Sequence, residues 1–464
     1  MTHAVQSRSH GLPAAIVATS LGFVVVQVDV SIVNVALPEI GGSLGMGVAG
    51  LQWVVDAYTL AFASLLLSAG SLGDRIGARK TFVAGFALFV AASLGCGLAG
   101  SAAALIAARA VQGVGAAVLV PCSLALLNHA CGNDATARAR AIGLWTAAGA
   151  VALSAGPVLG GMLVDTLGWP SIFLVNVPVG TAGLWLTLRF VEETPVERDG
   201  SRELDLSGQA LAVLTLFALT GAVIEAGSRG WHAPLVLSGL ALAVLSGIGF
   251  AIVEVRSAAP MLPLGFFRQP TFGTASLVGL LINLTVYGTI FVLSLYFQQV
   301  RRYSPVVTGF AFLPFMAAAA VSNVLGGRLA GGRGPRLPIV AGLLVGAAGY
   351  WLLHELNGAT PYPAMLPGLL LVSLGVGLAV PPMTSALLST VHRSRSGVAS
   401  GVLNTVRQAG GAIGVALFGS VTAGGVAAGA QLAFRLSSLL LVLAAISAVA
   451  GIRRQVPESS LKEY

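Results

Sequence analysis

The chain has 464 residues, and 56% of them are hydrophobic while only 9% are charged. Soluble domains carry about 25% charged residues, so this composition excludes a water-soluble fold and indicates a polytopic membrane protein. The formal net charge of +8 does not indicate a nucleic-acid partner, because in a membrane chain the position of each cation matters more than the sum. Cys96, Cys122 and Cys131 lack C-x-x-C spacing, so neither a disulfide framework nor a metal site is expected.

Apolar segments of about 20 residues recur along the whole chain, and this is the length that crosses about 30 Å of hydrocarbon. They predict an all-α polytopic membrane protein with about 14 transmembrane helices. The expected helices, in chain order, are 13–37, 50–71, 81–100, 103–127, 141–164, 171–191, 206–226, 233–254, 271–297, 306–328, 337–355, 364–388, 397–421 and 432–452.

The distribution of cations between these helices indicates how the chain is oriented. Most of the 25 lysines and arginines fall on the side that also holds both termini. Because cytoplasmic segments of membrane proteins carry an excess of Lys and Arg, both termini are expected in the cytoplasm. The cations expected outside are Arg229, Arg301, Arg302 and Arg435.

Two weak internal repeats divide the chain. Gly113-Val-Gly-Ala-Ala-Val118 reappears as Gly375-Val-Gly-Leu-Ala-Val380, and the spacing of Gly70, Leu72, Gly77 and Arg79 reappears from Gly327 to Arg336. Each separation covers eight of the expected helices rather than six, so two helices are expected to be inserted between two six-helix bundles. The expected domains are an amino-terminal six-helix bundle (1–192), a charged linker with two inserted helices (193–256), and a carboxy-terminal six-helix bundle with a cytoplasmic tail (257–464).

Three charged residues of the amino-terminal bundle are expected at similar depths in the membrane. Asp29 lies about 12 Å below the outer surface at 1.5 Å per residue, and Asp56 and Arg109 lie about 9 Å below it. Carboxylates at membrane depth are costly unless paired or hydrated, so they usually mark ion or proton pathways. We therefore expect Asp29 to alternate between protonated and ionised states, with Arg109 stabilising its carboxylate and tuning its affinity for protons. The alternative is a permanent structural ion pair.

Other polar and aromatic residues are candidates for substrate binding. Asp56 either attracts a cationic drug or is hydrated at the membrane rim. Trp53 and Tyr58 either form an aromatic wall for a ligand or anchor their helix at the interface. Arg407 lies about 15 Å into its helix and needs a partner, yet the middle of the carboxy-terminal bundle has no obvious acidic residue, so mostly apolar substrate contacts are expected there. The full set of candidates is Asn34, Trp53, Asp56, Tyr58, Gln112 and Arg407.

Two glycine-rich segments are expected to control helix movement and packing. The turn from Gly70 to Lys80 places a carboxylate and cations at helix ends, where they would pair with the other bundle in one conformation and release it in another. The alternative is a basic loop that follows the positive-inside rule. The expected latch residues are Gly70, Asp74, Arg75, Gly77 and Arg79.

Further along the chain, Gly156-Pro157 with Gly160 and Gly161 is expected to set a bend and close packing. The physical reason is that proline removes a backbone hydrogen bond and glycine admits a neighbouring helix.

Several of these segments resemble the major facilitator superfamily, and in particular its 14-span drug:proton antiporter family. The similar segments are 29–38, 70–80, 109–115, 149–161, 169–180 and 404–411. The resemblance implies the major facilitator fold, and it makes the segment with Gly156-Pro157 the antiporter motif. It also implies proton-coupled export of small hydrophobic or cationic drugs or antibiotics, by alternating access across a bacterial cytoplasmic membrane. The expected partners are the substrate, protons and the lipid bilayer, with the chain working as a monomer without a cofactor.

Two other functions compete with this one. The first is a proton-coupled uptake symporter for a nutrient or metabolite, because the fold fixes neither substrate nor direction; the antiporter-like Gly-Pro segment argues against it. The second is a membrane-embedded enzyme or sensor, which would need a cluster of His, Asp or Ser residues. The six histidines are scattered at helix ends and loops, so an enzyme is not expected.

Overall fold

The computed structural model describes residues 2–132, 134–194, 205–257, 260, 262–392 and 395–452, except for the side chains of 2–12, 67, 74, 135, 139 and 331–333. Within these residues every regular element is a helix, and thirteen helices are long and apolar enough to cross a membrane. A further helix of similar length, α14 (Ser396–Thr422), carries Arg407. The predicted all-α fold with about 14 membrane helices is confirmed.

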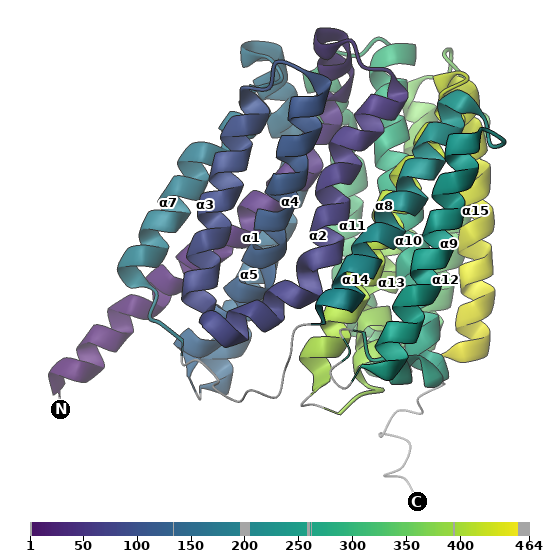
Figure 1. The fold of residues 1–464 in the computed structure, drawn as a ribbon. Coiled ribbons are helices and arrows are strands. Elements are labelled where there is room, and N and C mark those ends of the chain that lie inside the picture. The colour runs from purple at the N-terminus through teal and green to yellow at the C-terminus, as the bar shows by residue number, and fades with distance from the viewer. Residues whose placement is uncertain are drawn as a thin grey trace, which may run out of the picture. The chain divides into compact units, whose positions relative to one another are not determined.

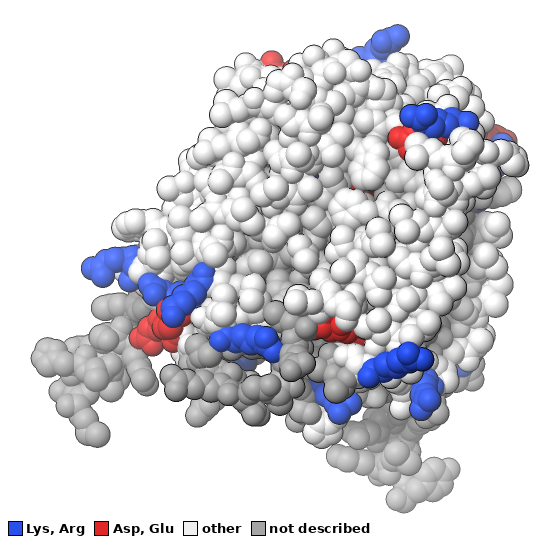
Figure 2. All heavy atoms as spheres, viewed as in Figure 1, with Lys and Arg blue, Asp and Glu red and all other residues white. Residues whose placement is uncertain are grey.

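The chain divides into two compact units, of which unit 1 comprises Met1–Val213 and Ser304–Phe310, and unit 2 comprises Leu214–Tyr303 and Ala311–Tyr464. On the face drawn in Figure 2, charged side chains gather near the helix ends and the apolar stretches between them carry almost none, as a bilayer requires. The predicted domain boundaries near 192 and 256 stay a prediction. Most of the predicted charged linker, residues 195–204, lies outside the described residues.

Unit 1 is built from the first helices of the chain (Figure 1), and α4 packs closely on both α2 and α3 while α1 packs on α5. Their bounds are α1 (Thr2–Leu44), α2 (Val48–Ile76), α3 (Ala78–Gly97), α4 (Ala102–Cys131), α5 (Ala135–Leu167), α6 (Ser171–Leu174) and α7 (Asn176–Phe190).

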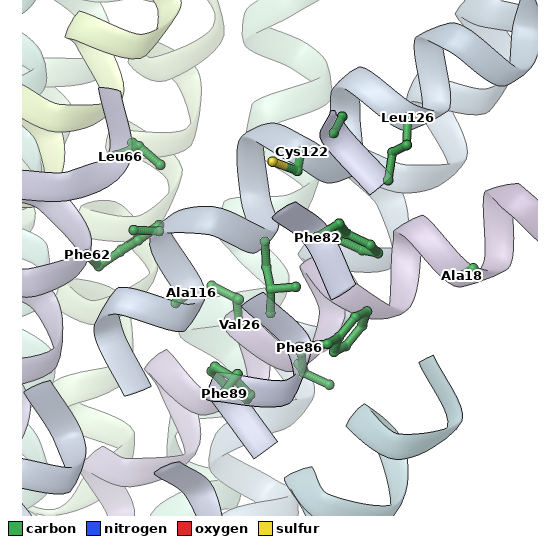
Figure 3. Packing of buried hydrophobic residues seen from close by; sticks show 14 of the residues in the cluster. Ala18, Val26, Phe62, Leu66, Phe82, Phe86, Phe89, Ala116, Cys122 and Leu126 are labelled. Atoms are coloured by element: carbon green, nitrogen blue, oxygen red, sulfur yellow. The ribbon is translucent and has the colours of Figure 1, made fainter. Parts of the chain in front are cut away.

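The helices of unit 1 approach one another through glycine and phenylalanine. A Cβ atom on Gly22 of α1 would lie 2.5 Å from the Phe82 ring, and one on Gly183 of α7 would lie 2.6 Å from the Phe86 ring. Figure 3 shows these rings of α3 among buried side chains of the neighbouring helices. Lipid tails are as apolar as these side chains, so close van der Waals packing rather than burial from water holds the helices together.

Two helices depart from the sequence prediction in instructive ways. The expected helix 171–191 is broken at Val175 into α6 and α7. Pro178 lacks the N–H that would bond to the carbonyl of Leu174, which explains the break. The first helix continues past the expected end at 37 and stops at Leu44, where Gly45 takes a φ of +64°.

Unit 2 contains the remaining helices (Figure 1), in which α10 packs closely on α14 and α12 on α13. Glycine again lies at these contacts: a Cβ atom on Gly342 would lie 2.5 Å from the carbonyl oxygen of Gly375. The bounds are α8 (Leu206–Arg229), α9 (Pro234–Arg256), the 3-10 helix η1 (Leu264–Arg268), α10 (Pro270–Leu295) with the π-helical turn η2 (Tyr296–Val300), α11 (Pro305–Arg333), α12 (Arg336–Leu353), α13 (Tyr362–Leu388), α14 and α15 (Val426–Gly451). Two of these helices, α8 and α11, begin in unit 1.

Candidate functional site

A buried ion pair lies in unit 1 between α1 and α4. Nη1 of Arg109 lies 2.6 Å from Oδ2 of Asp29, and the two side chains are 1% and 0% exposed. The Arg109 guanidinium also donates from Nε to the backbone oxygen of Val54 at 3.0 Å and from Nη1 to Oε1 of Gln112 at 2.7 Å. The cation is therefore tied to α1, α2 and its own helix at once.

Two amide side chains complete the coordination of the Asp29 carboxylate. Gln112 donates to its Oδ1 at 2.8 Å and to Oγ of Ser93 at 2.9 Å, and Asn176 donates to the same Oδ1 at 3.0 Å. Asp29 thus accepts three hydrogen bonds, one of them from a cation. A buried ion pair is stable only when such additional bonds satisfy its remaining polar atoms.

Aromatic rings shelter this cluster. The guanidinium carbon of Arg109 lies 4.2 Å from the centre of the Tyr58 ring and 5.6 Å from that of Phe173. Tyr58 itself is buried, with 1% of its surface exposed. Its ring therefore packs on the ion pair, and the aromatic wall for a ligand that the sequence suggested as one possibility stays a prediction.

Local sequence features explain how these groups meet. Arg109 and Gln112 are three residues apart and so share one face of α4. A Cβ atom on Gly113 would clash with the backbone oxygen of Tyr58, and one on Gly115 would lie 2.9 Å from the backbone nitrogen of Phe89. Glycine at both positions lets α4 come close enough to α2 and α3 for its polar side chains to reach their partners.

Asp56 is the second buried carboxyl group of unit 1, and its surroundings differ from those of Asp29. It lies in α2, has no exposed surface, and neither carboxyl oxygen has a hydrogen-bond partner among the described residues. The depths worked out from the sequence placed Asp56 level with Arg109, but the structure shows no ion pair between them within the part of the chain that it describes. Nothing in the described structure balances a negative charge on Asp56.

The first two helices carry two other candidates from the sequence. Asn34 is buried and donates to the backbone oxygen of Val30 in its own helix at 3.0 Å. Trp53 is half-buried on α2.

The start of α3 binds to the end of α7 and to the segment that follows it. Arg79 donates to the backbone oxygen of Leu188 at 2.8 Å and lies 3.5 Å from the Glu193 carboxylate, while the Ala78 backbone N–H donates to Thr194. Gly77 is buried with a φ of +99°, a region that favours glycine.

The other predicted latch residues are less defined. Gly70 and Arg75 are half-buried near the end of α2. The side chain of Asp74 lies outside the described residues.

The Gly-Pro segment of α5 makes close contacts on two sides. Cβ atoms on Gly156 and Gly160 would meet Ser31 and Ile32 of α1. A Cβ atom on Gly161 would lie 2.5 Å from the backbone oxygen of Pro305 and 2.6 Å from the Cα atom of Val306, at the start of α11.

This second contact is reinforced by a reciprocal glycine. A Cβ atom on Gly309 would meet the carbonyl of Pro157, and the Val306 backbone N–H donates to Asp165 of α5 at 3.3 Å. The segment is thus a close-packing site for α1 and for the first turn of α11.

Sequence reasoning missed Asn176 and Ser93 as members of the cluster. Asn176 stands in the segment 169–180 that was noted for its family resemblance, and an amide inside an apolar helix is itself a signal for a buried partner. The break at Val175 sets the position of Asn176 at the first residue of α7, and that break was not predicted.

Comparisons with known proteins agree with this picture. Residues 19–415 match the model of the Major Facilitator Superfamily. The chain is 41% identical over 412 residues to the Multidrug resistance protein Stp of Mycobacterium tuberculosis (strain CDC 1551 / Oshkosh), covering 88% of this chain and 75% of that one. It is 38% identical over 406 residues to the Methylenomycin A resistance protein of Streptomyces coelicolor, covering 88% and 85%. A crystal structure of a POT family transporter in complex with 5-aminolevulinic acid has a similar fold, with a TM-score of 0.72, 13% identity and 96% of each chain covered.

Proposed function

Because the chain belongs to the Major Facilitator Superfamily, we propose that it exports small hydrophobic drugs or antibiotics from a bacterium in exchange for protons. Relatives at 41% and 38% identity are named for multidrug resistance and for resistance to methylenomycin A, which supports export of compounds of this class. Export would follow alternating access across the cytoplasmic membrane, with both termini in the cytoplasm and one chain sufficient for transport. The excess of Lys and Arg on one side supports this orientation.

The observation that carries the proposal is the buried pair of Asp29 and Arg109 with its two amide partners. Protonation of Asp29 would neutralise the carboxylate that accepts hydrogen bonds from Arg109, Gln112 and Asn176. The interactions that join α1, α4 and α7 would then weaken. Proton binding would then be converted into freedom of these helices to shift, which is the kind of two-state element that a coupled transporter requires.

Asp56 is the second group that we propose for proton coupling. Its carboxyl oxygens have no partner among the described residues, so no bond has to be broken when it takes up or releases a proton. Ionisable residues inside membrane segments mark proton relays by default. We propose this role for Asp56 in place of the two alternatives from the sequence, which were attraction of a cationic drug and hydration at the membrane rim.

We propose that the glycine contacts of α5 and the contacts of Arg79 change as the helices move during transport. Gly161 would allow α5 and α11 to close on each other, and Arg79 would be released from Leu188 and Glu193 as the helices move.

Proton release from proteoliposomes tests the proposal. Vesicles with an acidic interior and a trapped pH dye are challenged with a panel of antibiotics, and we expect the interior to become alkaline with at least one compound. Asp29→Asn and Asp56→Asn are expected to abolish this exchange. Glu355→Gln, a control at a side chain that is 82% exposed, is expected to leave it unchanged. In vesicles with a neutral interior, acidification driven by an added nutrient would instead identify a symporter and contradict the proposal.

A further inference from the structure

Arg407 is a cation near the middle of a membrane helix. It is the twelfth of the 27 residues of α14, so it lies about 16 Å from the start of the helix at 1.5 Å per residue. The side chain is half-buried, and its Nε has no hydrogen-bond partner among the described residues. Charged side chains at this depth almost always pair with another charge or line a water-filled cavity.

The second half of the chain offers Arg407 almost no carboxylate. After Asp205 the sequence has no aspartate and only five glutamates, Glu225, Glu254, Glu355, Glu458 and Glu463.

The three described glutamates of this group are engaged elsewhere. Glu225 pairs with Arg229 at 2.6 Å, Glu254 accepts a hydrogen bond from the backbone of Leu262 at 3.0 Å, and Glu355 is 82% exposed beside His354. Within the described part of unit 2, Arg407 therefore has no acidic counter-ion.

The neighbours of Arg407 form an apolar and aromatic surface. A Cβ atom on Gly279 of α10 would lie 3.3 Å from Cγ of Arg407, 3.1 Å from Leu403 and 3.4 Å from Met383. Tyr287, also on α10, packs on α14 one turn after Arg407, where a Cβ atom on Gly411 would lie 3.2 Å from its ring. A guanidinium without an acidic partner among the described residues, beside apolar side chains and a phenol ring, suits a ligand with an apolar body and an oxyanion.

We infer that Arg407 binds a carboxylate of the exported compound, so that the substrates include hydrophobic organic anions. This inference rests on the proposed export function and narrows its substrate class. It departs from the cationic drugs that the sequence suggested, because the half-buried charge that lacks a counter-ion among the described residues of unit 2 is positive. The planar fork of arginine fits a carboxylate with two parallel hydrogen bonds, which a lysine cannot reproduce.

The test compares two probes that share one ring system and differ in charge, 1-naphthylacetate and 1-naphthylacetamide. Binding to the purified protein in nanodiscs is measured by calorimetry, and the wild type is expected to prefer the carboxylate. Arg407→Gln should weaken binding of the carboxylate by about 10- to 100-fold, which is the effect of losing a hydrogen bond to a charged group. The same variant should change binding of the amide by less than about 3-fold.

Two further variants separate a specific effect from a loss of folding. Arg407→Lys keeps the charge and should retain part of the preference for the carboxylate. Arg435→Gln removes an exposed arginine of the neighbouring helix α15 and should leave both affinities unchanged.

Three results would overturn the inference: a wild type without preference for the carboxylate, an equal loss for both probes in Arg407→Gln, or equal effects of Arg407→Gln and Arg435→Gln. An equal loss for both probes would indicate that Arg407 pairs with a carboxylate of its own chain. Proton exchange keeps the two proposals apart. If no compound drives exchange in the wild type, the export function fails, whereas exchange without a preference for the carboxylate contradicts only the role of Arg407.

Discussion

The two buried carboxyl groups of unit 1 are expected to respond very differently to the same substitution. Asp29→Asn and Asp56→Asn both replace an acid with an amide of nearly the same shape. At Asp29 the change removes the negative charge that faces Arg109. It also puts an NH₂ donor in place of one acceptor oxygen, either Oδ2, which accepts from Arg109, or Oδ1, which accepts from Gln112 and Asn176. At Asp56 it removes no hydrogen bond that the described residues make.

The magnitudes follow from these contacts. Removing one partner of a buried ion pair leaves the other charge uncompensated and costs about 3–5 kcal/mol. At a few degrees for each kcal/mol, Asp29→Asn should lower the apparent Tm by on the order of 10 °C. Asp56→Asn exchanges one unpartnered polar group for another and should change the free energy of unfolding by less than about 1 kcal/mol.

Thermal unfolding of the purified variants in detergent, followed by tryptophan fluorescence, measures the difference. The double variant Asp29→Asn/Arg109→Gln is the matched control, because it removes both charges and should recover part of the loss. Equal Tm values for the two single variants would refute the reasoning, and so would a double variant less stable than Asp29→Asn. If Asp56→Asn is as stable as the wild type, a loss of proton exchange in this variant would reflect proton coupling rather than stability.

Two further substitutions test the packing and the missed member of the cluster. Gly161→Ala would place a Cβ atom 2.5 Å from the backbone oxygen of Pro305. We therefore expect it to lower the free energy of unfolding by about 1–3 kcal/mol and to slow drug-driven proton release. The control Gly143→Ala, whose Cβ atom would have no neighbour within 4 Å among the described residues outside its own helix, should behave as wild type. Asn176→Ala removes one donor from a buried carboxylate and should destabilise the protein by about 1–3 kcal/mol, as measured by the same thermal unfolding; a Tm equal to that of the wild type would show that this bond contributes nothing.

The sequence predicted the helices because their lengths depend on distance along the chain, and the depths derived in the same way stay predictions. An apolar run has a countable length, and a fixed rise per residue gives the depth of Asp29 and Arg109. The sequence paired Arg109 with Asp29 but did not predict that Asp56 would have no hydrogen-bond partner among the described residues, because that depends on the direction in which each side chain leaves its helix. Asn176 was missed for the same reason, since its contact with Asp29 also depends on the direction in which its side chain leaves the helix.

The partner of the α5 glycines was equally out of reach. Gly161 meets Pro305 and Val306, which follow it by more than a hundred residues, and no local pattern records such a contact. The roles proposed for Asp29, Asp56, Arg407 and the latch residues stay predictions.

The ion pair of Asp29 and Arg109 also has a consequence for how the protein is made. The two residues are 80 positions apart in the chain, and Asn176 follows Asp29 by 147 positions. At about 5–20 residues per second, the ribosome adds Arg109 about 4–16 s after Asp29 and Asn176 about 7–30 s after it. The first helix therefore enters the membrane with an aspartate whose partners have not yet been synthesised. An aspartate at the centre of an inserting helix costs about 2.5–3.5 kcal/mol, and the long apolar stretches on either side of Asp29 must offset this until α4 and α7 arrive.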